Sequence, residues 1–396
     1  MSLTRPDLIP RNRATALLAA LALMNLAFAA VLIVPSYVTA ESMGTAPGQI
    51  PDFAAFWAAA AMTLEGAPAA AYDWNAHRAV EVAELGRDFN GFMAWHYPPH
   101  VQLAVTPLGA LPLFAAMALW VGGTLALFLW TCWRILPHPN AVLAGLAAAP
   151  TALTLVNGQI GFLIAALTGL ALLDLDRKPL RAGLWLGLLS LKPHLVVALP
   201  VPLLVTGRWR AVFGGAATVL ALAALSWAVL GSDTWAAFIA SITQTSGVFA
   251  GADGRWTMYA NLYGGLRFAG VGFAAALFIH LGVAIAVLTL TVQAWRAPTT
   301  SPEIKAALIC FAAVVATPRI LNYDLHILVI GALFQARHAL RHGFFPGEHL
   351  LLGAVALAAF LSMLAAPAAN PLLALALFGG CWWGHARQAV YPLERR

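Results

Sequence analysis

Long apolar runs separated by short polar or basic segments make up almost the whole chain. Runs of about 18 or more apolar residues indicate transmembrane helices, because a helix needs about 20 residues to cross a bilayer. We therefore expect an all-α polytopic membrane protein with about 12 crossings (about 11 to 13). The expected crossings are 14–38, 113–133, 140–156, 158–175, 182–191, 195–206, 210–230, 271–294, 304–317, 325–340, 348–366 and 371–388.

Composition agrees with this pattern. Of the 396 residues, 61% are hydrophobic and 10% are charged, whereas soluble domains carry about 25% charged residues. The formal charge of +6 comes from basic clusters between apolar runs, as in cytoplasmic loops, so we expect no nucleic-acid partner. The sequence predicts one integral membrane domain over residues 1–396, with both termini cytoplasmic.

Residues 40–98 form the longest segment that lipid cannot bury, and the charge pattern places it outside the cytoplasm. It contains seven acidic residues and two basic ones. Its stretches 52–65 and 75–86 are expected to be short helices on the membrane surface. Residues 98–111, interrupted by proline, are expected to form a half-helix or an interfacial piece. A second outer loop is expected at about 231–268.

Four polar interruptions fall on the same membrane face in this topology: Asp52 with its loop, 157–159, 192–194 and 319–324. Several flanking helices are too short to span a bilayer. Irregular backbone at that depth is tolerated only where protein buries it or where it lines a water-filled cavity. We therefore expect these four segments to surround a cavity that opens outward.

Two interpretations remain open for each ionisable residue in these segments. Asp52 either caps a surface helix or acts as a general base. Lys192 and His194 are candidates for substrate binding, because ionisable residues at membrane depth are usually functional. The alternative for Lys192 is that its side chain extends to the lipid headgroups. Arg319 either binds phosphate or pairs with Asp324.

Aromatic residues of the first loop also allow two interpretations. They form an interfacial belt, or some of them stack on a sugar. The aromatic or histidine residues concerned are Trp57, Tyr72, Trp74, Trp95, His96 and Tyr97. We expect contacts with the substrate or the acceptor from Trp57, His96, Tyr97, Gln159, Tyr323 and Asp324.

No metal site or soluble cofactor is expected. The three cysteines, Cys132, Cys310 and Cys381, lie in apolar runs without CxxC spacing. His338 and His342 have helical spacing but lie at a basic helix end. Walker A, HExxH and GxSxG motifs are absent from the sequence.

An ordered set of short motifs resembles glycosyltransferase family 87, whose members include polyprenol-phosphate-mannose-dependent alpha-mannosyltransferases. The motifs are Asp52-Phe53 with Phe56-Trp57, Gly66, Tyr72, Tyr97-Pro98-Pro99, Pro107-Leu108 through Leu111-Pro112, Gly158-Gln159, Gly183 with Lys192-Pro193, Arg208-Trp209-Arg210 and Thr317-Pro318. The sequence departs from the family at 317–324, where relatives often carry Ser-Pro followed by Trp and His. That departure bears on the specificity for mannose and for the acceptor.

The resemblance implies a C-type glycosyltransferase (GT-C) fold with its catalytic carboxylate, here Asp52, in the first outer loop. It also implies a polyprenyl-phosphate hexose as donor. The resulting hypothesis is inverting transfer of a hexose, with mannose the expected sugar, to a hydroxyl of a glycolipid or glycan at the outer face of a bacterial inner membrane. Lys192, Arg319 and His194 would bind the donor phosphate. The alternatives are a transporter or lipid flippase that uses the same cavity and, more weakly supported, a structural membrane subunit.

Overall fold

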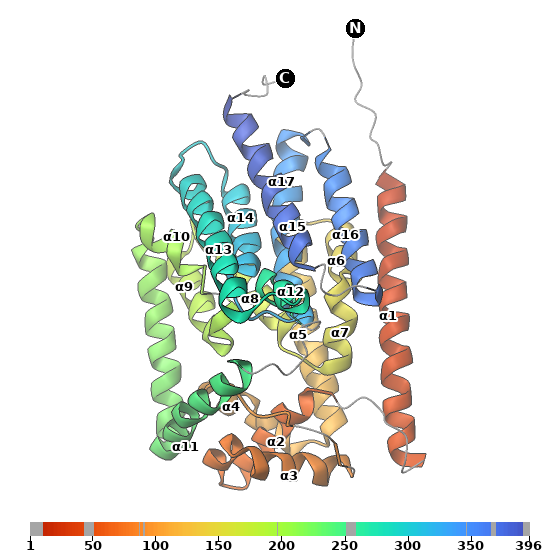
Figure 1. The fold of residues 1–396 in the computed structure, drawn as a ribbon, viewed down its shortest axis with the longest axis vertical. Helices are drawn as coiled ribbons and strands as arrows, with labels where there is room; N and C mark the ends of the chain where they lie inside the picture. The colour runs from red at the N-terminus through yellow and green to blue at the C-terminus, as the bar shows by residue number, and fades with distance from the viewer. Residues whose placement is uncertain are drawn as a thin grey trace.

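The computed structural model consists of helices joined by short turns (Figure 1). It describes residues 11–42, 51–86, 88–89, 92–195, 197–250, 259–345, 347–365 and 370–390. Within these ranges the only β pairing is an isolated antiparallel bridge between Tyr259 and Leu321. The structure has two parts: a bundle of long and short helices, and a layer of small helices across one end of it (Figure 1).

The layer, called the first-loop layer below, is built from the first loop and the segment 98–111 that follows it. It contains α2 (Phe53–Leu64), η1 (Pro68–Tyr72), α3 (Trp74–Leu85), α4 (Pro99–Val105) and η2 (Thr106–Ala110). The expected helices at 52–65 and 75–86 thus agree with α2 and α3 to within a residue. The segment 98–111 is a seven-residue helix followed by a 3-10 turn, too short to cross a bilayer.

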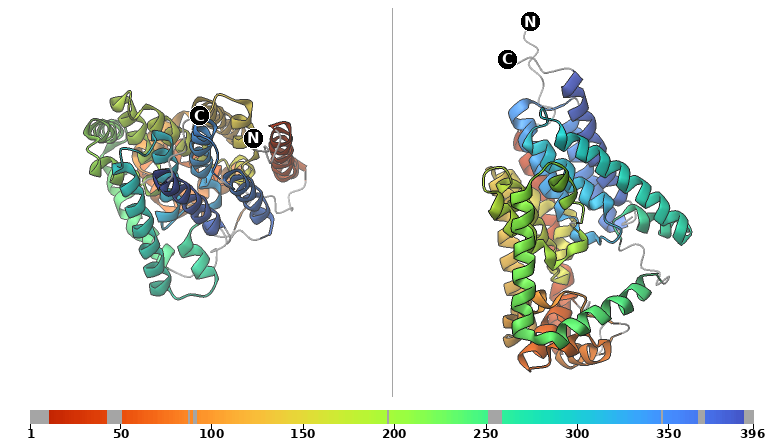
Figure 2. Two further views of the ribbon diagram at one scale, coloured as in Figure 1. Left: turned by 90° about the horizontal axis from the view of Figure 1, so that it is seen from above. Right: turned by 90° about the vertical axis from the view of Figure 1, so that its left-hand side faces the viewer.

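The bundle contains the remaining helices, and Figure 2 shows it from two further sides. They are α1 (Arg11–Ser42), α5 (Leu113–Ile135), α6 (Pro139–Ala147), α7 (Ala149–Asn157), α8 (Gly161–Asp174), α9 (Pro179–Leu188), α10 (Pro200–Val205), α11 (Trp209–Ala250), α12 (Leu262–Phe268), α13 (Phe273–Arg296), α14 (Pro302–Ala316), α15 (His326–His342), α16 (Glu348–Ala365) and α17 (Asn370–Val390). The core surrounds α14, whose residues from Ala306 to Ala316 are all buried. The start of α1 and the end of α17 lie at the same end of the bundle (Figure 1).

Four helices are long and apolar enough to cross a membrane unaided, within Arg13–Leu32, Leu113–Ile135, Trp209–Thr243 and Phe273–Arg296. The pair α6 and α7, bent by 64° at a short break, would make a fifth among the described residues. This identifies a membrane protein. The expected count of about 12 crossings stays a prediction, because helices such as α9 and α10 are only 10 and 6 residues long.

The second outer loop is more helical than the sequence pattern indicated. The helix expected to end near residue 230 continues as α11 to Ala250, with a kink at Gly231. Gly231 has φ 82° and ψ 168°, a conformation that glycine adopts without a Cβ penalty. Beyond the kink, α11 packs on α4 and η1 in the first-loop layer, with the rings of Phe238 and Tyr72 in contact.

The break between α6 and α7 is stabilised by a polar residue of another helix. Asn25, in the middle of α1, is fully buried. Its Nδ2 donates to the carbonyl oxygens of Leu146 at 3.1 Å and Ala148 at 2.9 Å. Pro150 follows the break and cannot supply a donor of its own. In an apolar setting an unpaired carbonyl is costly, so Asn25 supports the bend that directs α7 towards the first-loop layer.

Replacing Asn25 with Leu is expected to lower the free energy of unfolding by about 1–2 kcal/mol, because both carbonyls lose a buried donor. Thermal unfolding of the detergent-purified variant measures the loss. Leu23→Ala is the matched control, since Leu23 lies on the same helix with 68% of its side chain exposed. Equal stability of the two variants would contradict the role of Asn25.

Candidate active site

Asp52 occupies the N-cap position of α2 but does not cap it. Its side chain makes no capping hydrogen bond, whereas Asp73 caps α3 by accepting from the amides of Asn75 and Ala76 at 2.9 Å each. The Oδ2 of Asp52 instead accepts a hydrogen bond of 2.7 Å from the Nε2 of Gln159. The carboxylate is therefore hydrogen-bonded to a residue of the bundle, 107 positions away in sequence.

The turn between α7 and α8 places Gln159 against Asp52. Gly158 ends α7 with φ 66°, in the left-handed region that favours glycine. A Cβ added there would lie 2.5 Å from the Cβ of Phe53, so only glycine allows this close approach. The conformation and the contact together explain why glycine stands at position 158.

Tyr97 fixes the orientation of the Gln159 amide. Because Nε2 donates to Asp52, the Oε1 atom is left to accept, and it lies 3.4 Å from the Tyr97 hydroxyl. The Tyr72 hydroxyl donates to the Tyr97 carbonyl at 2.9 Å, and the Phe56 ring packs against the Tyr97 ring. A hydrogen-bonded chain thus runs from the first-loop layer through Gln159 to one oxygen of Asp52.

Lys192 forms a buried ion pair with Asp324. The Lys192 Nζ lies 2.7 Å from the Asp324 Oδ1 and 5.2 Å from the centre of the Tyr323 ring. The two charged residues are 7% and 1% exposed. The Asp324 Oδ2 also accepts from the amide of Leu321 at 3.3 Å. The sequence suggested Arg319 as a possible ion-pair partner of Asp324. In the structure Lys192 forms an ion pair with this carboxylate.

Arg319 lies on a turn that is tied to the Lys192 segment. The Thr317 hydroxyl donates to the His194 carbonyl at 3.2 Å. The Asn261 Nδ2 donates to the Thr317 carbonyl at 2.9 Å, and the Ala260 amide donates to the Ile320 carbonyl at 2.8 Å. These bonds satisfy backbone groups where α14 ends before Pro318. Arg319 is half-buried and interacts electrostatically with Tyr97, Tyr323 and Asp324.

Burial raises the pKa of Asp52 above its ordinary value. The hydrogen bond from Gln159, the charge of Lys192 and a hydrogen bond from Tyr323 oppose this rise, and the negative charge of Asp324 adds to it. A carboxylate in such a setting holds a proton more readily than one in water, which suits a general base.

Two histidines at the edge of the site are neutral at pH 7. Burial lowers the pKa of His96 to about 4, with Arg319 and His77 contributing. Burial also lowers the pKa of His194 to about 3, with contributions from Lys192 and Arg319. Both residues keep part of their surface exposed. Both side chains are therefore neutral imidazoles at the edge of the site.

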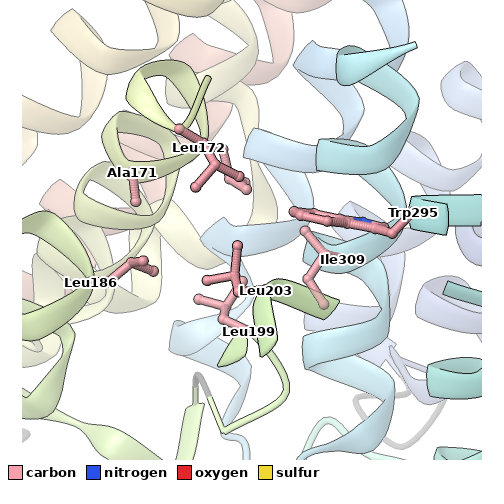
Figure 3. A pocket seen from close by; sticks show the side chains of 8 residues that line it. Ala171, Leu172, Leu186, Leu199, Leu203, Trp295 and Ile309 are labelled. Atoms are coloured by element: carbon pink, nitrogen blue, oxygen red, sulfur yellow. The ribbon is translucent and has the colours of Figure 1, made fainter. Parts of the chain in front are cut away.

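The structure brings together most of the residues that the sequence singled out. The buried floor of the site consists of Gln159, Lys192, Tyr323 and Asp324. The residues that reach the surface to different degrees are Asp52, His96, Tyr97, His194 and Arg319. Trp57 is engaged elsewhere, because its Nε1 donates to the Leu111 carbonyl at 2.7 Å between α2 and α5. Figure 3 shows a pocket that differs from the outward-opening polar cavity expected from the sequence. This pocket is apolar and lies between α8, α9, α10, α13 and α14.

Sequence reasoning missed two supporting residues. Tyr72 was named only as part of a possible aromatic belt and of the family motifs, and Asn261 fell within the expected outer loop at about 231–268. Their partners are the backbone carbonyls of Tyr97 and Thr317, which no side-chain pattern reveals. Among the described residues, no group of three or more His, Cys, Asp and Glu side chains is placed to hold a metal ion.

Comparison with known proteins gives one result. Residues 95–318 match the sequence model of glycosyltransferase family 87. The matched segment includes Gln159, Lys192 and His194 but begins after Asp52 and ends before Arg319. No curated protein and no solved structure matches the chain.

Replacing Gly158 with Ala is expected to destabilise the protein and separate Gln159 from Asp52. A left-handed Ala costs about 1–2 kcal/mol, and the collision with Phe53 adds about 1–3 kcal/mol of overpacking. Gly86→Ala is the control, since Gly86 has φ 64° with no atom within 4 Å of an added Cβ. Thermal unfolding compares the two variants. A loss no greater for Gly158→Ala would show that the close approach does not constrain this turn.

Proposed function

Because the chain belongs to glycosyltransferase family 87 and is built around membrane-spanning helices, we propose that it transfers a hexose from a polyprenyl phosphate to an acceptor hydroxyl. The sugar we propose is mannose, the acceptor is a glycolipid or glycan, and the fold is of the GT-C type. One observation carries the proposal. The carboxylate of Asp52 is held by the Gln159 hydrogen bond within electrostatic reach of the buried Lys192.

In the proposed reaction Asp52 is the general base. It takes the proton of the acceptor hydroxyl as that oxygen attacks the anomeric carbon. The bond from the anomeric carbon to the phosphate oxygen breaks, and its electron pair leaves with the polyprenyl phosphate. Attack from the face opposite the phosphate inverts the anomeric configuration.

Lys192, Arg319 and His194 are proposed to stabilise the leaving phosphate as its negative charge grows. Lys192 is already paired with Asp324, so we assign Asp324 the role of holding the ammonium group in place instead of contacting the acceptor. Fixed charges need little reorganisation during the reaction. The scheme requires no metal ion or other cofactor.

The sugar and acceptor would lie against the exposed rim of the site. Tyr97 offers an aromatic face next to Asp52, and His96 offers a neutral imidazole beside Arg319. Aromatic faces beside a carboxylate suit the stacking and hydrogen bonding of a pyranose. Trp57 is left out of this proposal, because its indole is directed to the Leu111 carbonyl.

The proposed orientation places the first-loop layer outside the bacterial inner membrane. The last turns of α5, α13 and α15 carry Arg134, Arg296 and Arg341. Basic residues at helix ends favour the cytoplasmic side. The layer with Asp52 lies at the opposite end of the bundle (Figure 1), where a lipid-linked donor in the outer leaflet would reach it.

Wild-type protein in lipid nanodiscs is expected to move radiolabelled mannose from synthetic polyprenyl-phosphate-mannose into extracted membrane lipid. Asp52→Asn should lower the rate by about 10² to 10⁴, the usual contribution of a general base. Asp73→Asn is the matched control, because Asp73 is an acid of the same loop that caps a helix and Asn caps almost as well.

The outcomes of this assay separate the parts of the proposal. Equal rates for wild type and a folded Asp52→Asn variant would remove Asp52 from the mechanism. An inactive wild type would exclude mannose as the sugar. Failure of glucosyl and galactosyl donors as well would contradict transfer from a polyprenyl phosphate.

The pH dependence of transfer tests the function of Gln159. Transfer requires ionised Asp52, so the rate falls as the pH drops through the pKa of Asp52. The Gln159 bond lowers that pKa, so Gln159→Leu should raise it and move the acid limb of the kcat/KM profile to higher pH. Tyr97→Phe should move it in the same direction by less, because the amide is then less firmly oriented.

Gln102→Leu controls for the loss of a buried amide, here in the first-loop layer that contains Asp52. The Gln102 Nε2 donates to the Thr63 hydroxyl and the Pro68 carbonyl, both at 2.8 Å. This variant should lower stability and leave the acid limb where it is in wild type. An acid limb that does not move in Gln159→Leu would contradict the positioning of Asp52 by Gln159.

A further inference from the structure

A hydrogen bond between His100 and Ser190 joins the first-loop layer to the bundle. The His100 Nε2 lies 3.1 Å from the Ser190 Oγ. His100 is on α4, which packs on α2 and α11, and it is 6% exposed. Ser190 belongs to η3 (Leu189–Leu191), a single turn that directly follows α9. The bond therefore runs from the layer that contains Asp52 to the turn that leads into Lys192.

A serine bonded to a histidine can also be a nucleophile with its base, an arrangement in which a third group orients the imidazole. The His100 Nδ1 is buried and makes no hydrogen bond within the described part of the chain. Burial lowers the pKa of His100, so the imidazole is neutral at pH 7. The pair therefore lacks the third group of a catalytic triad, and its effect lies in the position of the turn.

Lys192 ends this turn and is held on both sides in sequence. Its amide donates to the Leu189 carbonyl at 3.1 Å, which closes the turn. Two residues further on, the His194 carbonyl accepts from the Thr317 hydroxyl at 3.2 Å. The ammonium is held separately by its ion pair. The bond to His100 fixes the backbone on the side that precedes Lys192.

The proposed reaction requires a defined separation between the Lys192 ammonium and the Asp52 carboxylate. In an inverting transfer the base and the leaving phosphate lie on opposite sides of the anomeric carbon. A displacement of about 1 Å in such a site can lower the rate about 10²-fold. Helix α2, which begins directly after Asp52, packs on α4, which contains His100. A bond from α4 to the turn before Lys192 can therefore set this separation.

We propose that His100 is a positioning residue of the phosphate site. It holds the turn before Lys192 to the first-loop layer, so that the Lys192 ammonium meets the phosphate of a polyprenyl phosphate. His100 acts through Ser190 and does not touch the phosphate itself. This role rests on the proposed function, because Lys192 is taken there to bind the phosphate.

Binding of undecaprenyl phosphate tests this role without requiring transfer, and native mass spectrometry of the delipidated full-length protein gives its Kd. His100→Leu and Ser190→Ala are each expected to weaken binding about two- to tenfold, the effect of losing one hydrogen bond. The double variant should bind no more weakly than either single variant, because both remove the same bond. His100→Gln should keep most of the affinity, since its amide retains a hydrogen-bonding nitrogen.

The loss of affinity must also depend on Lys192. In a Lys192→Gln background, His100→Leu should cause no further loss. Gln102→Leu is the matched control, because Gln102 is a fully buried residue of α4 whose hydrogen bonds stay within the first-loop layer. It should lower the temperature of thermal unfolding and leave the Kd unchanged.

The outcomes separate this role from the proposed function. Wild type that does not bind undecaprenyl phosphate would contradict the proposed phosphate site, and the role of His100 with it. Wild type that binds no better than His100→Leu and Ser190→Ala would contradict the role of His100 alone. An equal loss in Gln102→Leu, or an undiminished loss in the Lys192→Gln background, would do the same. If His100→Leu does not fold, Ser190→Ala carries the test, because it removes one oxygen at a half-buried position.

Discussion

The hydrogen bond from Gln159 to Asp52 joins the two parts of the structure, and the proposed site depends on it. Asp52 belongs to the layer at one end of the bundle, and Gln159 belongs to the break between α7 and α8. The bond forms because Gly158 adopts a left-handed conformation directly against Phe53. It forms in the right direction because the Tyr97 hydroxyl occupies the other end of the amide.

The remaining polar groups of the site lie at breaks between helices. At these breaks side chains pair with backbone groups that the ends of the helices leave without a helical partner. Asn25 serves the break between α6 and α7, Asn261 serves the end of α14, and Thr317 donates to the His194 carbonyl. Because unpaired backbone is costly in an apolar setting, such breaks persist only with these donors. Once present, they bring Lys192 and Asp324 close to the carboxylate of Asp52, with Arg319 beside Tyr97 and Tyr323.

Local patterns in the sequence predicted the local structure well. The expected surface helices at 52–65 and 75–86 agree with α2 and α3 to within a residue, and the family resemblance was confirmed over residues 95–318. Pairings over long separations were not predictable. The Lys192–Asp324 pair spans 132 positions, whereas the sequence suggested only Arg319, five residues before Asp324, as a possible partner. The orientation of the Trp57 indole was likewise not predictable from the sequence, because its hydrogen-bond acceptor is a backbone carbonyl.

The central claim is that a lipid-linked sugar binds with its anomeric carbon facing Asp52 and its phosphate among Lys192, Arg319 and His194. Electron cryo-microscopy of the protein with a phosphonate analogue of polyprenyl-phosphate-mannose tests this most directly. We predict density for the sugar beside Asp52 and Tyr97, with the phosphonate within hydrogen-bonding distance of at least one of the three cationic or imidazole groups. A headgroup bound at the opposite end of the bundle would contradict the claim.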